Sequence, residues 1–67
     1  MKTLEVGMMV KCYGNPEFSE LEWIIDDVRD DWYIVSRIDQ WGYYEMLPVG
    51  DNDISAVLID DKWEDYK

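Results

Sequence analysis

Pairs of adjacent carboxylates are the residues of this 67-residue chain best suited to acid–base chemistry. They occur at 26–27, 30–31, 60–61 and 64–65. General acid–base catalysis needs carboxylates that converge in a pocket with their pKa values pushed apart. Neighbouring acids on a strand or turn point away from each other instead. The chain also has no histidine and no serine or cysteine beside a plausible base. We therefore interpret the pairs as a solvated surface and expect a protein that is not an enzyme.

The segment 51–55, Asp-Asn-Asp-Ile-Ser, begins like an oxygen-rich calcium loop. The glycine position of an EF-hand holds Ala56, and the position of its final bidentate glutamate holds Lys62. The alternative is a turn in which Asp51 or Asn52 caps a single helical turn. We favour that alternative and expect no metal and no cofactor.

The distribution of the acids is more informative. Seven of the 16 acids lie in 17–31 and six lie in 51–67. If the segment that follows the first strand lies near the turn after the second, these acids form one negative face. Rows of carboxylates can imitate phosphates, so a DNA mimic that binds a basic protein is one interpretation. The other is an acidic coat without a partner. The candidate protein-binding acids are Glu17, Glu20, Asp27, Asp30 and Asp31.

Ten aromatic residues, of which four are Trp and five are Tyr, exceed what the core of so small a domain can hide. Trp41 and Tyr43 flank the glycine of an expected turn, and Trp32 follows two aspartates. Aromatic side chains anchor protein interfaces while charges steer the encounter. We add Trp32, Trp41 and Tyr43 to the candidate protein-binding residues. The alternative is that they fold back over the open ends of a barrel.

The net charge of −10, from 16 acids against six bases, limits the possible partners. It argues against direct binding of nucleic acid, which demands Lys and Arg, and against an anionic membrane surface. A basic protein fits it. Cys12 is the only cysteine, so no internal disulfide forms, and the N-terminal stretch lacks a signal-peptide pattern. We expect a soluble cytoplasmic protein.

The residues that would position these side chains form an antiparallel meander. Aromatic and β-branched runs separated by polar turns predict strands at 8–13, 22–28, 32–38, 43–47 and 56–59. The segment 14–21 is expected to be irregular, with Phe18 and Leu21 tucked inward and a helical turn as the alternative. The charged tail 60–67 docks or frays.

Three details of these strands are expected from the sequence. Two adjacent aspartates predict a bulge near 26–28. The third strand has two possible inner faces, and we choose the uncharged one, Trp32, Ile34, Ser36 and Ile38, over Tyr33, Val35 and Arg37. Pro48 is expected to end the fourth strand because it cannot donate to a central ladder.

The layout resembles the SH3-like small barrels. The strand at 8–13, the excursion 14–21, the meander 22–48 and the turn and strand at 51–59 carry the resemblance, and the Trp32-Tyr33 pair is similar to the aromatic pair that opens the family's middle strand. The Ala-Leu-Tyr-Asp-Tyr run of true SH3 domains is absent, and Leu47-Pro48-Val49-Gly50 does not supply the ligand shelf, so polyproline recognition is not implied. In size and acidity the chain is also similar to phage and mobile-element accessory proteins.

The expected fold is therefore an all-β, five-stranded SH3-like barrel in one domain, 1–67, with a short helical turn before the last strand. The expected function is a non-enzymatic acidic protein-binding module that inhibits or modulates a basic or nucleic-acid-binding partner. The rival is a small structural protein that assembles as a homo-oligomer. Salt discriminates the two, because it weakens charge-steered binding and not apolar self-assembly.

Overall fold

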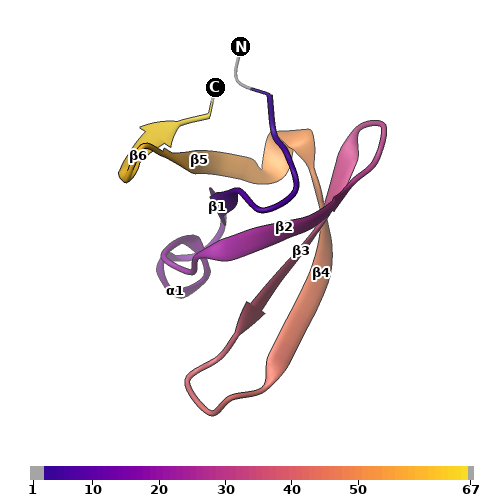
Figure 1. Cartoon of the computed structure of the whole chain (residues 1–67). Helices are drawn as coiled ribbons and strands as arrows, with labels where there is room; N and C mark the ends of the chain where they lie inside the picture. Colours follow the sequence, from indigo (N-terminus) through magenta and orange to yellow (C-terminus); the bar gives the residue numbers. More distant parts are fainter. Residues whose placement is uncertain (1–2, 67) are drawn as a thin grey trace.

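The computed structural model describes residues 3–66 and shows one antiparallel sheet of six strands in the order β4-β3-β2-β1-β5-β6 (Figure 1). The all-β prediction is confirmed. The strands are β1 Met9–Cys12, β2 Trp23–Val28, β3 Trp32–Ile38, β4 Tyr44–Gly50, β5 Ile54–Ile59 and β6 Lys62–Asp65. A helical turn, α1 Pro16–Ser19, follows β1, and a 3-10 turn, η1 Asp51–Asp53, precedes β5.

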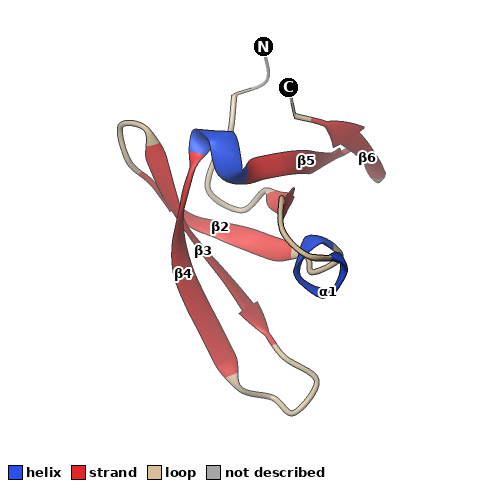
Figure 2. Cartoon of the chain, turned by 180° about the vertical axis from the view of Figure 1, so that it is seen from behind, coloured by secondary structure: helices blue, strands red, loops and turns tan. Residues whose placement is uncertain are grey.

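The predicted five-stranded barrel is wrong, because the sheet has six strands and stays open. Its two edges, β4 and β6, lie at opposite ends of the strand order. β1 is only four residues long and pairs with β2 through Met9 and Val10, whereas β3 and β4 pair over seven positions. The loop end of the long β3–β4 hairpin therefore projects away from β5 and β6 (Figures 1 and 2).

The sixth strand comes from the tail that was expected to dock or fray. Asp60 and Asp61 both have positive φ angles, 51° and 67°, and connect β5 to β6. Two consecutive positive φ values are typical of the tight turns whose twist matches that of a hairpin, and aspartate tolerates them. β6 then pairs with β5, and Tyr66 lies buried against the core. Lys67 lies outside the described residues.

The core is a single cluster of buried side chains from five of the strands and both ends of the chain. Trp23, Ile25, Val35, Ile54 and Val57 are fully enclosed. Partly buried side chains, including Phe18 and Leu21, pack against this cluster, which confirms the prediction that those two tuck inward. The other members of the cluster are Leu4, Val10, Cys12, Tyr33, Val49 and Tyr66.

The inner face chosen for β3 is wrong. Tyr33 and Val35 are buried, whereas Ile34 is half-buried and Ile38 is 68% exposed. The prediction placed the side with Arg37 outward because a charged residue is costly to bury. Arg37 lies on the inner side of β3 near the C-terminal end of the strand. There its guanidinium lies 5.7 Å from the Trp23 ring and forms an ion pair with Glu45.

Local features of the remaining elements follow from their residues. Asn15 caps α1 by accepting a hydrogen bond from the Phe18 N–H at 2.9 Å, so the helical alternative holds for Pro16–Ser19. The predicted bulge is confirmed by a register shift between Ile25 and Asp27. The prediction that Pro48 ends its strand is wrong: β4 is an edge strand, where the missing N–H removes no hydrogen bond from a second neighbour.

Candidate functional site

The eight candidate residues do not form one face. Asp30 and Asp31 lie in the turn before β3, and Trp32 begins that strand, whereas Trp41 and Tyr43 lie in the loop after it. β3 has seven residues, so at about 3.3 Å per residue its two ends lie roughly 20 Å apart. α1, which carries Glu17, lies at the beginning of β2 and therefore far from the β2–β3 turn (Figure 1). The proposed continuous acidic face is thus divided into two ends.

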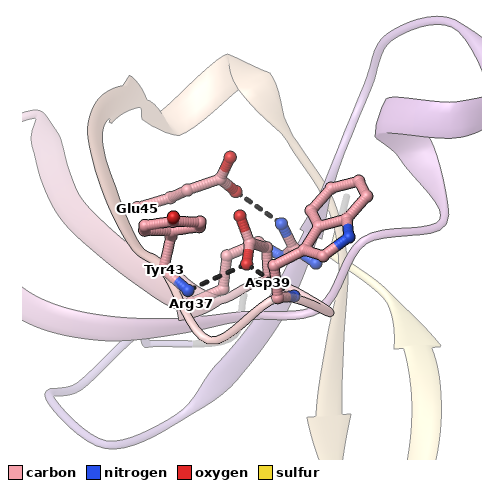
Figure 3. A network of polar contacts seen from close by, with 5 residues as sticks. Arg37, Asp39, Tyr43 and Glu45 are labelled. Atoms are coloured by element: carbon pink, nitrogen blue, oxygen red, sulfur yellow. Dashed lines mark hydrogen bonds and ion pairs between the residues drawn. The ribbon is translucent and has the colours of Figure 1, made fainter.

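The β3–β4 loop is held in shape by Asp39. The Asp39 Oδ1 atom accepts hydrogen bonds from the backbone N–H groups of Trp41 and Tyr43, each at 2.9 Å (Figure 3). Gly42 closes the turn with a φ of 86° and donates to the Asp39 carbonyl. The loop thereby presents Trp41, which is 75% exposed, and Tyr43 as outward-pointing aromatic groups on a fixed backbone.

Arg37 and Glu45 lie on the two strands that this loop connects. They face each other across β3 and β4, and the Arg37 Nη1 and Glu45 Oε2 atoms form an ion pair (Figure 3). The guanidinium also lies over the ring of Trp23. A planar guanidinium between a carboxylate and an aromatic face is well suited to bridge charge and apolar surface. Arg37 is therefore held by internal partners and leaves the neighbouring acids to face solvent.

A hollow of about 510 Å³ lies between α1 and the β3–β4 loop. It is lined by three carboxylates and one guanidinium, together with apolar and amide side chains. The structure thus brings Glu17 and Trp41 to one site, although the sequence placed them 24 positions apart. The lining residues are Asn15, Glu17, Phe18, Leu21, Arg37, Asp39, Gln40, Trp41 and Glu45.

A second hollow of about 450 Å³ adjoins the first and shares Phe18, Leu21 and Glu45 with it. It follows β4 along residues 44–47 and reaches Trp23. Trp23 is 1% exposed, and its Nε1 atom is buried without a hydrogen-bond partner, alone in this respect among the side-chain atoms of residues 3–66. We call the two hollows together the groove. Its first half is lined by three carboxylates and Trp41, and its second half has Glu45 as its one carboxylate.

In the other group of candidates only Asp27 is compensated within the described part of the chain. Asp27 forms an ion pair with Arg29 at 2.8 Å, and the guanidinium of Arg29 lies 5.8 Å from the Trp32 ring. Asp30 and Asp31 are exposed in the turn, and Glu20 is exposed just beyond α1. Glu20 lines neither half of the groove. This end therefore has exposed acids beside Trp32, but these residues line neither half of the groove.

Asp39, Glu45 and Arg37 are functional candidates that the sequence analysis did not identify. Asp39 had a local signal, because an aspartate three positions before a glycine is typical of a turn in which the side chain accepts backbone N–H groups. Glu45 and Arg37 had no such signal. Their roles depend on strand register, which joins residues eight positions apart in the sequence.

The calcium-like segment is a structural turn. Asp51 Oδ1 accepts hydrogen bonds from the hydroxyls of Tyr33 and Tyr66, and Asp53 Oδ2 accepts from the Gly50 N–H at 2.8 Å. A helical turn is present as expected, but Gly50, rather than Asp51 or Asn52, occupies its N-terminal cap. Burial, followed by the hydrogen bond to Asp51, raises the pKa of Tyr66. Within residues 3–66 no three His, Cys, Asp or Glu side chains are grouped to hold a metal.

Cys12 lies in the core and takes no part in the groove. Its side chain is 1% exposed. Burial, and to a smaller extent the negative charge of Asp53, raises the pKa of the thiol to about 11. A thiol that remains protonated and enclosed at neutral pH is a poor nucleophile.

Compared with known proteins, the chain matches no protein-family model, no curated protein and no solved structure. Its function therefore has to be argued from its own surfaces. Across residues 3–66 no helix is long and apolar enough to cross a membrane.

Proposed function

We propose that the protein is a non-enzymatic binding module for a basic protein, and that the groove receives a basic segment of that partner. One observation carries the proposal. Glu17, Asp39 and Glu45 line the same hollow as Trp41, where only Arg37 opposes them and is already paired with Glu45. A lysine or arginine side chain would meet carboxylates and an aromatic face together, which is the environment that cations prefer.

The charges of the whole chain support the same class of partner. Among the described residues, Lys11 lies 4.6 Å from the ring of Trp63, Arg29 pairs with Asp27 and Arg37 pairs with Glu45. These cations are therefore occupied by internal contacts, while the net charge of the chain is −10. Such a field accelerates the encounter with a positively charged surface.

Nucleic-acid-binding proteins carry surfaces of this kind, because they neutralise phosphates with Lys and Arg. We extend the proposal to inhibition or modulation of such a protein, in which carboxylates stand where phosphates would bind. The cytoplasm, a reducing compartment in which an unpaired buried thiol is the normal state, is the proposed location.

Capture from the native host at low salt identifies the partner, and surface-immobilised kinetics with the purified partner test the groove. Trp41→Ala is expected to raise the dissociation rate by about tenfold, as for an interface anchor. Glu17→Gln is expected to lower mainly the association rate. Asp61→Asn is the matched control, because it removes the same charge from a turn that lines neither half of the groove, where asparagine tolerates the positive φ.

The proposal requires that the groove variants weaken binding more than Asp61→Asn does, with all three variants folded. Equal binding by all three variants would assign the acids to a general coat. An association rate that does not fall with salt would exclude charge steering, since screening acts within about 10 Å at 0.1 M salt.

A further inference from the structure

The free edge of β4 presents backbone groups that bond to no other strand. Among residues 3–66, β4 pairs with β3 on one side and with no strand on the other (Figure 1). The Asp39 N–H donates to the Tyr43 carbonyl at 2.9 Å, which makes these two opposite residues a hydrogen-bonded pair. Such pairs alternate with non-bonded pairs along an antiparallel ladder. Tyr44 and Met46 therefore hold non-bonded positions opposite β3, and their N–H and C=O groups point away from it.

The rest of the two sheet edges is closed to an added strand. On β4, Pro48 shares the outward parity and has no N–H to donate, and the Gly50 N–H already donates to Asp53 Oδ2 at 2.8 Å. β6, the opposite edge, has four residues, three of them charged. Short strands, charges and proline are the usual protection of an edge against pairing. The open donors are therefore those of Tyr44 and Met46.

The groove runs beside this part of β4. Its second half is lined by all four residues 44–47 and, from other elements, by Phe18, Leu21 and Trp23. Consecutive residues of a strand point to opposite sides of the sheet, so a hollow lined by four in a row follows the edge of the strand rather than one side of it. Its volume of about 450 Å³ lies in the range of sites that hold ligands. The open backbone groups thus border a space into which a segment of another chain fits.

We infer that an extended basic segment of the partner binds as an additional strand along β4, with its backbone bonded to Tyr44 and Met46. Addition of a strand to an exposed sheet edge is a general mode of peptide recognition, in which backbone bonds give affinity and alternate side chains give specificity. The inference rests on the proposed function and specifies the conformation of the segment that the groove receives. A second copy of the chain is the less favourable occupant, because it would bring Glu45 and a net charge of −10 against the same acids.

The register of such a strand predicts the sequence pattern of the segment. In an antiparallel pair, residues that lie opposite each other point to the same side of the sheet. The segment residues opposite Glu45 and Leu47 therefore point into the groove. A lysine or arginine opposite Glu45 meets its carboxylate, and an apolar residue opposite Leu47 meets Phe18 and Leu21. A second cation opposite Tyr43 lies beside the β3–β4 loop. The expected pattern, written from the N-terminus, is apolar-x-basic-x-basic.

Amide hydrogen exchange measured by NMR tests the open edge in the free chain. We expect fast exchange at Tyr44 and Met46 and slow exchange at Glu45 and Leu47, whose N–H groups pair with β3. The probe for binding is the peptide acetyl-Thr-Val-Thr-Lys-Thr-Lys-Thr-amide at low salt. Titration to about 5 mM is expected to give a dissociation constant of about 0.1–1 mM and to slow exchange at Tyr44 and Met46. The peptide acetyl-Thr-Thr-Val-Lys-Lys-Thr-Thr-amide has the same composition without the alternation and is expected to bind at least about threefold more weakly.

Met46→Pro tests the backbone bond directly. Proline removes the outward N–H at position 46 and leaves the bonds to β3, as Pro48 does two positions further along. We expect peptide binding to weaken about tenfold, because the peptide carbonyl that faces this position loses its donor. Met46→Ala is the matched control, since it removes the side chain and keeps the N–H, and it is expected to change binding by less than about threefold.

Circular dichroism checks that both Met46 variants fold. A second measurement leaves the protein unaltered: N-methylation of the peptide's second threonine, which faces Met46, removes a donor of the same ladder from the other side. It is expected to weaken binding of the parent chain about tenfold.

The inference would be overturned by equal binding of Met46→Pro and Met46→Ala, by equal binding of the two peptides, or by no binding of the first peptide to the parent chain. Slow exchange at Tyr44 and Met46 in the free chain would also overturn it, and exchange that quickens on dilution would assign the edge to a second copy. Failure of the proposed function is distinguishable, because Glu17→Gln and Trp41→Ala would then leave binding of the captured partner unchanged. Failure of this inference alone leaves those two effects in place.

Discussion

At the scale of single residues, Asp39 and Cys12 have roles that follow directly from their contacts. Asp39 is an acid whose position matters more than its charge, because one of its oxygens accepts two backbone N–H groups of the loop that presents Trp41. Cys12 is a reactive residue type that burial makes inert. Each role leads to a prediction that separates it from a general effect of charge or polarity.

Asp39→Ala is expected to loosen the loop, and Asp39→Asn is expected to preserve it. Asparagine keeps a side-chain oxygen in the same place and removes the charge, whereas alanine removes the acceptor altogether. Amide hydrogen exchange at Trp41 and Tyr43 is the measurement. We expect both amides to lose protection in Asp39→Ala and to retain it in Asp39→Asn. Similar protection in all three proteins would show that the backbone alone holds the loop.

Cys12 is expected to make stability depend on pH above 9. Its pKa is about 11 in the folded chain against an ordinary value of 9.0. The folded state therefore holds the proton more tightly, so the thiol's contribution is complete below pH 9 and is lost as the pH rises through 11. The loss by pH 10 should be about 1 kcal/mol. Urea denaturation at pH 8, 9 and 10 measures it, and Cys12→Ala should show a shallower decline between pH 8 and 10 than the parent.

At the scale of elements, β3 connects the core with the groove. Its inner positions, Tyr33 and Val35, complete the core, and Arg37 continues the same side into the groove. Its other positions, which begin with Trp32 and end with Ile38, point to the opposite side of the sheet. One strand thus connects the core with the proposed partner site.

The two sides of β3 are expected to respond differently to truncation. Val35→Ala removes two enclosed methyl groups and should lower the free energy of unfolding by about 2–3 kcal/mol, which is severe for so small a domain. Ile34→Ala removes more atoms from a half-buried position and should lower it by about 1 kcal/mol. Chemical denaturation of both variants is the measurement. A larger loss for Ile34→Ala would reverse the assignment of the inner face.

At the scale of the whole molecule, charge acts against compactness. The chain carries 16 acids and six bases in a body of 35 by 23 by 23 Å. Like charges crowded into so small a volume repel one another, and a net charge far from zero destabilises the compact state. The same charge is what attracts a basic partner, so stability and partner binding depend on salt in opposite directions.

Raising sodium chloride from about 10 mM to about 150 mM shortens the screening length from about 30 Å to about 8 Å. We therefore expect the thermal midpoint of the free protein to rise by a few degrees while the association rate with the basic partner falls. Differential scanning fluorimetry at a fixed protein concentration measures the thermal midpoint. A midpoint that falls with salt would mean that internal ion pairs outweigh repulsion among the acids.

The amino-acid sequence by itself determined the local features. Aromatic and β-branched runs predicted the strands, including the bounds of β3 at Trp32–Ile38, and the adjacent aspartates predicted the bulge. Phe18 and Leu21 were predicted to pack inward, and a helical turn was predicted near Asp51. These features depend on residues close together in the chain, where propensity and turn chemistry act directly.

Only the tertiary structure decided which side of β3 is inner, whether the sheet closes, and which candidate residues meet. Both sides of β3 carry apolar residues, so the alternation of the sequence does not identify the inner side. In the structure Arg37 lies on the inner side, where its guanidinium lies over the ring of Trp23. The sheet is open, with β4 and β6 as its two edges. The edge strand β6 forms because the chain makes a tight turn at Asp60 and Asp61. Glu17 and Trp41 share a hollow because register and a projecting hairpin bring distant segments together, and such non-local pairing is not encoded in any short stretch of sequence.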